Sequence, residues 1–150
     1  IFFARGTLET MKKLRWTPDV IYCSGWMSAL VGLYAKKAYS DTPFFENAKI
    51  ILSLDDQEYD VPFSSKFVDK LLIDGMLHSD VRSIEGLPVG YEDLMRLAID
   101  NADALVMSSP TVNQRLSNYA QNSGKIVLPY SEETYKDDLM ELCNSLLSQE

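Results

Sequence analysis

The sequence predicts a three-layer α/β/α sandwich built on a mostly parallel, Rossmann-like sheet. Four short apolar segments each run into a turn of small or acidic residues, and helical periodicity follows the turns. Strands that alternate with helices pair in parallel through right-handed crossovers. One of these segments, Lys49 to Leu54, contains a continuous apolar run, as expected where helices cover both faces of a sheet.

The first three predicted elements are a helix, a strand and a second helix. Residues 1–14 are predicted to be helical because their apolar residues share one helical face, namely Ile1, Ala4, Leu8 and Met11. Pro18 stops this helix, and residues 19–23 form the first strand. Residues 26–39 are predicted to form the second helix, whose inward-facing residues are Met27, Leu30, Val31, Tyr34 and Ala38.

The middle of the chain holds the second strand, at residues 49–54, and a short helix. Ser64 or Ser65 caps this helix and Gly75 ends it, and its apolar residues are Phe67, Val68, Leu71 and Leu72. Residues 75–90 have little periodicity and contain Gly75, Gly86, Pro88 and Gly90. We predict a long surface loop here, and loops of this length are often lids, binding segments or mobile.

The second half of the chain alternates in the same way. A helix is predicted at 91–101 and strands at 104–107 and 125–128. Ser109 and Ser131 are predicted to cap the helices that follow these two strands. The inward faces of the three helices are made of apolar residues: Leu94, Leu97 and Ala98, then Val112, Leu116, Tyr119 and Ala120, then Tyr135, Leu139, Leu142, Cys143 and Leu146.

Length and charge narrow the classes of function. The 150 residues make a single domain, and 22 acidic against 14 basic side chains give a formal net charge of −8. Nucleic-acid binding needs clustered cations. The only short basic cluster, Lys12, Lys13 and Arg15, is interpreted as the solvated end of a helix. We therefore expect no nucleic acid as a partner. We also expect no membrane, because the net charge is negative and the apolar runs fall well short of the ~20 residues of a bilayer span.

The residues that usually carry chemistry are sparse. Cys23 and Cys143 lie on predicted apolar faces, which favours buried free thiols and a cytoplasmic protein, with a disulfide or a nucleophile as the alternative. His78 has only Asp80 near it and is interpreted as a surface residue. The chain has no G-x-G-x-x-G, Walker or H-E-x-x-H motif and no nucleophile elbow. From the residues we assign no catalytic group, metal or cofactor.

Four strand-end turns are the candidate binding region. In a parallel sheet they share one edge, where ligands of open α/β folds bind. The candidate ligand-binding residues in these turns are Ser24, Gly25, Trp26, Asp55, Asp56, Ser109 and Thr111. Each has a structural alternative: Ser109 as an ordinary helix cap, the two aspartates as solvated loop acids, and Trp26 as a packing residue. The residues alone indicate a domain compatible with a sugar or a nucleotide.

Four segments together resemble bacterial glycogen/starch synthases. They are F-F-A-R-G-T-L-E at 2–9, W-T-P-D-V-I-Y-C at 16–23, G-W-M-S-A-L at 25–30 and A-D-A-L-V-M-S-S-P-T at 102–111. They occur in the family's order and spacing, and the resemblance covers roughly residues 2 to 120.

The resemblance implies one half of a GT-B type fold, in which two Rossmann-like domains face each other. It places residues 1–150 as the C-terminal part of a longer N-terminal domain. Family members transfer glucose from ADP-glucose to the non-reducing end of an α-1,4-glucan, with retention of configuration. Their C-terminal domain holds the donor nucleotide, whereas the N-terminal domain supplies a Lys-Thr-Gly-Gly-Leu loop and the acceptor side. An α-glucan or a nucleotide sugar is therefore the expected ligand.

Several positions depart from the family pattern. The family's His-Asp-Trp turn aligns with Ser24, Gly25 and Trp26, and its Ile-His-Asn aligns with Leu54, Asp55 and Asp56, so both histidines are replaced. A serine hydroxyl does not titrate near pH 7 and cannot act as the imidazole does. The family's Lys-Thr-Gly-Gly-Leu loop would precede Ile1, and the tyrosine after Ser-Pro-Thr is Val112.

These departures predict that the chain alone does not turn over substrate. The alternative is a non-catalytic module, derived from the family, that binds glucan or a protein partner. In the family, further strands precede the matched region, so an edge or a face of the sheet is expected to lie open here. A preceding segment or a second copy of the chain, in a homodimer, would cover it.

Overall fold

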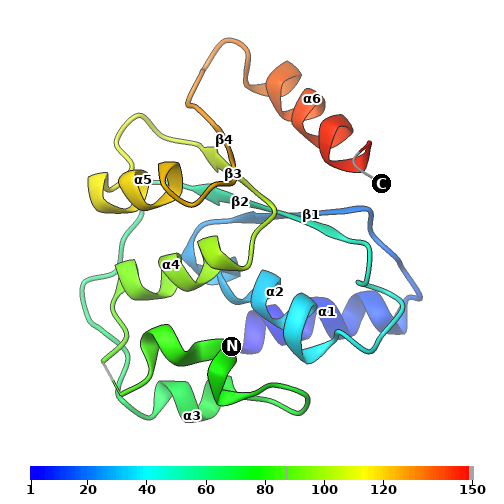
Figure 1. Cartoon of the computed structure of the whole chain (residues 1–150), viewed down its shortest axis with the longest axis vertical. Helices are drawn as coiled ribbons and strands as arrows, with labels where there is room; N and C mark the ends of the chain where they lie inside the picture. Colours follow the sequence, from blue (N-terminus) through cyan, green and yellow to red (C-terminus); the bar gives the residue numbers. More distant parts are fainter. Residues whose placement is uncertain (87, 149–150) are drawn as a thin grey trace.

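The computed structural model describes residues 1–86 and 88–148 and contains a four-stranded parallel sheet (Figure 1). Its strands follow the chain in the order β1-β2-β3-β4. They are β1 (Val20–Ser24), β2 (Lys49–Leu54), β3 (Ala104–Met107) and β4 (Ile126–Leu128). All three pairings are parallel, which confirms the predicted Rossmann-like α/β fold.

Helices flank the sheet unequally. They are α1 (Phe2–Lys13), α2 (Leu30–Leu33), α3 (Phe67–Leu71), α4 (Tyr91–Asp100), α5 (Gln114–Gln121) and α6 (Tyr135–Leu147). Because the strand order follows the chain order, right-handed crossovers bring every connecting helix to the same face. Helix α6 follows the last strand and lies on the opposite face (Figure 1).

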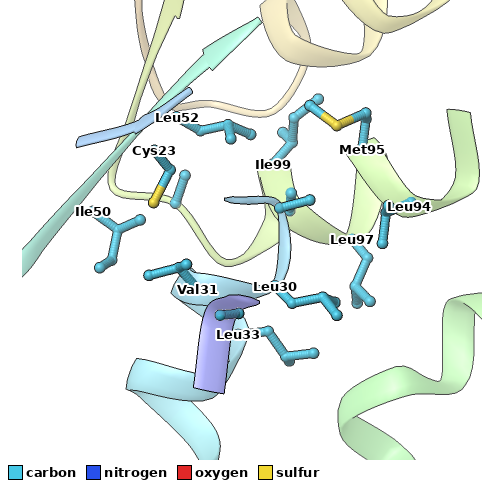
Figure 2. Close-up of a cluster of buried hydrophobic side chains, with 14 of the residues drawn as sticks. Cys23, Leu30, Val31, Leu33, Ile50, Leu52, Leu94, Met95, Leu97 and Ile99 are labelled. Atoms are coloured by element: carbon cyan, nitrogen blue, oxygen red, sulfur yellow. The ribbon is translucent and has the colours of Figure 1, made fainter. Parts of the chain in front are cut away.

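The main core lies between the sheet and the connecting helices. Figure 2 shows strand residues Cys23, Ile50 and Leu52 facing side chains of α2 and α4. A smaller core on the other face joins α6 to the two central strands through Ile51, Ala104, Val106, Leu142 and Leu146. Strands β2 and β3 are thus buried on both faces, as their apolar runs predicted.

The predicted helix at 26–39 is three short pieces rather than one. A 3₁₀ turn (Trp26–Ser28) leads into α2, and a π turn (Tyr34–Ala38) follows it. The π turn is anchored from outside, because the buried Tyr34 hydroxyl donates to the carbonyl oxygen of Leu71 at 2.9 Å. Of the residues predicted to face inward, Leu30, Val31 and Tyr34 are buried, whereas Met27 is 60% exposed. The prediction of one continuous α-helix was wrong.

The prediction of a long irregular loop at 75–90 is wrong in the middle of this stretch. The stretch contains a 3₁₀ helix, η3 (His78–Ile84), whose Val81 and Ile84 are buried in the main core. An antiparallel bridge between Phe63 and Val89 anchors its far end. Leu87 lies outside the described residues.

Strand β1 is an edge strand within the described residues, with β2 on one side only. Beside it, a groove of about 630 Å³ follows α1 and is lined mainly by apolar side chains. These include Phe2, Phe3, Met11, Leu14, Trp16 and Met27. An open edge was expected from the resemblance; what covers it stays a prediction.

Across residues 1–86 and 88–148, none of the helices has the length and apolar character that crossing a bilayer demands.

Candidate functional site

The turns that follow β1, β2 and β3 meet at the carboxyl edge of the sheet, because all the strands run in parallel. We call this surface the strand-end rim and define it by Ser24–Trp26, Asp55–Glu58 and Ser109–Asn113. The sequence-based prediction that these turns share one edge is confirmed.

Asp56 connects the second and third turns. Its Oδ2 accepts hydrogen bonds from Thr111 Oγ1 at 2.8 Å and Ser109 Oγ at 3.0 Å. These two hydroxyls hold the pKa of the exposed Asp56 carboxyl below its ordinary value, because they stabilise the charged form. Three predicted site residues are therefore brought into one hydrogen-bonded group.

Ser109 does not cap the helix that follows it, contrary to the prediction. The cap of α5 is Asn113, whose Oδ1 accepts from the backbone N–H of Arg115 at 3.0 Å and of Leu116 at 3.3 Å. The Ser109 hydroxyl instead accepts from the backbone N–H of Thr111 at 3.1 Å and donates to Asp56. Ser131 likewise lies outside its helix, because α6 is preceded by Thr134.

Gly25 lets the Asp55 carboxylate approach the first turn. Gly25 has φ 68° and ψ 176°, a backbone conformation essentially restricted to glycine. A Cβ at this position would lie only 3.0 Å from Asp55 Oδ2. The other oxygen, Oδ1, accepts from the backbone N–H of Gln57 at 3.0 Å. Gly25 therefore contributes shape to the rim rather than a binding group.

Trp26 is a half-buried packing residue at the border of the rim. Its ring meets Tyr59 edge-on, with centroids 5.1 Å apart. Tyr59 in turn contacts Phe63 at 5.0 Å and Tyr91 at 5.8 Å. The aromatic cluster joins the main core to the rim, and the Ser24 side chain is exposed.

Sequence analysis missed two rim residues, Glu58 and Asn113, and the buried Tyr91 at the start of α4. Asn113 Nδ2 donates to Glu58 Oε1 at 3.1 Å and to Glu92 Oε1 at 3.5 Å. Tyr91 was assigned only as the first residue of a helix, although its ring packs against Tyr59 and its buried hydroxyl has no hydrogen-bond partner in the described structure. Local signals for Glu58 and Asn113 exist, because Glu58 follows the two aspartates and asparagine is a favoured helix cap, whereas Tyr91 is identified only by its long-range packing.

Comparison of the sequence with known protein families identifies its family. The family model for the starch synthase catalytic domain matches residues 1–126. The chain belongs to this family. The chain is similar to the glycogen synthase of Chlorobaculum parvum, with 31% identity over 125 residues, which are 82% of the chain and 24% of that relative. The glycogen synthase of Chlorobium luteolum is 34% identical over 112 residues, which are 73% of the chain and 21% of that relative.

A third relative matches almost the whole chain. Glycogen synthase 2 of Geobacter metallireducens is 31% identical over 149 residues, or 99% of the chain and 30% of the relative. The chain therefore spans less than a third of the length of these starch synthase family relatives.

The Asp55 carboxylate occupies the space beside Gly25 that a side chain at position 25 would enter. The second turn thus places a negative charge next to the first turn.

The rim carries strong negative charge. Asp55, Asp56 and Glu58 lie in one turn, and Glu92 faces Asn113 from α4. Two cations on α4 and α5, Arg96 and Arg115, both pair with Glu92 at 3.7 Å. Within residues 1–86 and 88–148 no three Asp, Glu, His or Cys side chains are spaced to hold a metal ion.

The remaining titratable candidates lie away from the rim. His78 Nδ1 lies 3.0 Å from Glu85 Oε1 on an exposed surface, as predicted for a surface histidine. Burial raises the pKa of the Cys23 thiol to about 12, so this cysteine is a neutral core residue. Cys143 packs half-buried on α6. Both thiols are free, as expected.

Proposed function

We propose that this starch synthase family domain binds an α-1,4-glucan at the strand-end rim and forms the acceptor side of a glucosyl transfer. We also propose that the chain alone does not transfer glucose. Family membership supports a glycosyltransferase-like role, and the relatives carry the name glycogen synthase. The observation that carries the glucan proposal is the exposed Asp56 carboxylate, fixed by Ser109 and Thr111.

The chemistry of the rim suits an uncharged sugar chain. Sugar hydroxyls donate hydrogen bonds, and a positioned carboxylate is a strong acceptor because charge-assisted bonds are about twice as strong as neutral ones. Asp56 is held by two hydroxyls, and Asp55 by the backbone of its own turn. The half-buried Trp26 adds an apolar surface beside them. These features favour a neutral polyol over an anion.

The same charges oppose the departure of a nucleotide. Transfer from ADP-glucose needs positive groups that stabilise the leaving diphosphate. Arg96 and Arg115 pair with Glu92, and the second turn contributes three carboxylates. A diphosphate at this rim would meet repulsion, so the groups that assist its departure must come from outside this chain.

The binding experiment is a titration of the ¹⁵N-labelled chain with maltoheptaose. We expect amide shifts in residues 24–26, 55–58 and 109–113, and a lower affinity for Asp56→Asn because the strongest acceptor is neutralised. Asp41→Asn is the matched control, since Asp41 is also an exposed aspartate and lies in the loop before β2, away from the rim. Shifts that spare the rim, or equal weakening by both variants, would refute the glucan site.

The activity experiment incubates the chain with ADP-glucose and glycogen and measures the release of ADP. We expect release at the level of a blank without enzyme. Any reproducible elongation of glycogen above that blank would refute the proposal that residues outside this chain are required.

A further inference from the structure

Strand β1 leaves one side of the sheet without a partner strand. Within residues 1–86 and 88–148 it pairs with β2 and with no other strand. The Asp19 carbonyl oxygen accepts from β2 at 2.9 Å, and the Gly25 N–H donates to β2 at 3.4 Å. Because backbone groups alternate in direction along a strand, those of Val20, Tyr22 and Ser24 point outward. An edge of this kind is a template for another strand.

The opposite edge of the sheet is protected, and β1 is not. Strand β4 has only three residues, enclosed between Lys125 and Pro129. Short strands, lysines and prolines are common means of preventing further pairing at an edge. In β1, neither a charge nor a proline falls on the three residues whose backbone groups point outward. The chain therefore leaves one edge able to accept a strand.

The groove along α1 reaches this edge. It continues into a second hollow of about 410 Å³, because Phe3, Thr7, Met11 and Trp16 line both. All five residues of β1 line the second hollow. Every residue that lines either hollow is uncharged, in a protein whose formal net charge is −8. Two copies can therefore meet at this surface without opposing like charges, although their net charges repel overall.

The exposed apolar area approaches what a stable dimer needs. Five large side chains that line the groove are each 50–91% exposed: Phe2, Phe3, Leu14, Trp16 and Met27. At about 200 Å² for a large side chain, they leave roughly 600 Å² of apolar surface open. A standard interface buries about 800 Å² per partner. The edge of β1 and the rest of the groove add to the apolar area.

We propose that two copies of this chain form a dimer through antiparallel pairing of their β1 strands, around a two-fold axis at Tyr22. Tyr22 is the middle residue of β1, so its outward N–H and C=O bond the same groups of the second copy. Val20 then lies opposite the second copy's Ser24.

The two-fold axis is perpendicular to the joined sheet, so both α1 helices lie on the same face and each covers the apolar groove of the other. The carboxyl ends of the two sets of strands point in opposite directions, which leaves both strand-end rims open. The dimer is therefore independent of the proposed glucan site.

Sedimentation equilibrium of the unmodified chain tests the assembly. We expect a monomer–dimer equilibrium with a dissociation constant of roughly 1–100 µM, because the interface is of modest size. More dilute protein is then monomeric, with an open groove. A chain that stays monomeric up to about 200 µM overturns the inference. Assemblies larger than two overturn it as well, because two-fold pairing closes on itself.

Two pairs of variants locate the interface. Tyr22→Lys brings like charges together at the axis and should weaken the dimer at least about tenfold. Ile126→Lys is the matched control, because Ile126 is similarly exposed on the other edge strand. Phe2→Asp should also weaken the dimer, whereas Met140→Asp, on the exposed side of α6, should leave it unchanged. Equal effects within either pair would place the contact elsewhere and overturn the inference.

Hydrogen exchange of the unmodified chain tests the register without any substitution. The Tyr22 amide points outward, so it should exchange slowly in concentrated protein and rapidly in dilute protein. The amides of Ile21 and Cys23 point toward β2 and should exchange slowly at both concentrations. A dimer whose Tyr22 amide exchanges equally fast at both concentrations does not pair through β1, and the inference fails.

Discussion

Two helical glycines should respond in opposite directions to alanine, because only one of them is pressed against another element. Gly32 in α2 lies against the end of α4: a Cβ there would meet the Asn101 carbonyl oxygen at 2.9 Å and Ile50 Cγ2 at 3.1 Å. Gly6 in α1 has no heavy atom within 4 Å of the corresponding position.

The carbonyl that Gly32→Ala would strike has little freedom to move. Asn101 ends α4 and is buried, and its side chain donates to the Leu97 carbonyl at 2.8 Å. On the other side, Ile50 lies within β2 and is paired with β1. The contact therefore has to be relieved by separating α2 from the sheet and from α4.

The magnitude follows from two terms. Alanine gains about 1 kcal/mol over glycine in a helix interior, and this gain applies to both positions. Overpacking a well-packed core costs about 1–3 kcal/mol, and this cost applies to Gly32 alone. We expect Gly6→Ala to stabilise by about 0.5–1 kcal/mol. The difference in unfolding free energy between the two variants isolates the steric cost, which should be about 1–3 kcal/mol.

Urea unfolding of both variants measures this difference from the transition midpoints, provided that the slopes agree. If Gly32→Ala is as stable as Gly6→Ala, the close approach of α2 to α4 does not constrain the fold. If Gly6→Ala is destabilised instead, another group occupies the groove along α1.

Two further predictions concern the Asp56 carboxyl, which Thr111 holds, and the Asn113 cap of α5. The pKa of the Asp56 carboxyl, followed by NMR, should lie below that of an ordinary aspartate and should rise in Thr111→Val. Because the folded-state pKa is the lower one, ionised Asp56 stabilises the fold above its unfolded pKa. This stabilisation is lost as the pH falls through the folded-state pKa. An unchanged pKa in Thr111→Val would mean that the hydroxyl is not the cause. Asn113→Ala should cost about 1 kcal/mol of unfolding free energy because α5 loses its cap. An equal effect of Ser109→Ala on α5, seen by hydrogen exchange, would contradict the cap assignment.

Strands were the most predictable elements, and helix starts were less so. The bounds of β2 and β3 agree with their apolar runs, because burial on both faces leaves a continuous signal. The start of α5 was misplaced because Ser109 followed by Pro110 is a good local helix start. Asp56, 53 residues away from Ser109, binds the serine hydroxyl instead, and this competition is invisible in a local pattern.

The 75–90 stretch shows a second limit of sequence patterns. Val81 and Ile84 are the buried residues of a 3₁₀ helix, and two apolar residues three positions apart are too few to establish a helical period. The prediction of a loop rested on the glycines and the proline that flank these two residues. For the rim, the shared edge followed from strand direction alone, whereas Tyr91 is linked to its border by packing that only the folded chain creates.

The unequal layers of the fold follow from simple dimensions. A helix with its side chains is about 10–12 Å across, whereas neighbouring strands lie about 4.8 Å apart, so one helix covers the middle of a four-stranded sheet and leaves its edges open. Helix α6 accordingly buries Ile51 on β2 and Ala104 on β3. On the same face, Tyr22 on β1 stays 39% exposed and Ile126 on β4 stays 43% exposed. Their exposure is thus the expected result of covering this face with one helix, and it is no evidence by itself for a binding partner.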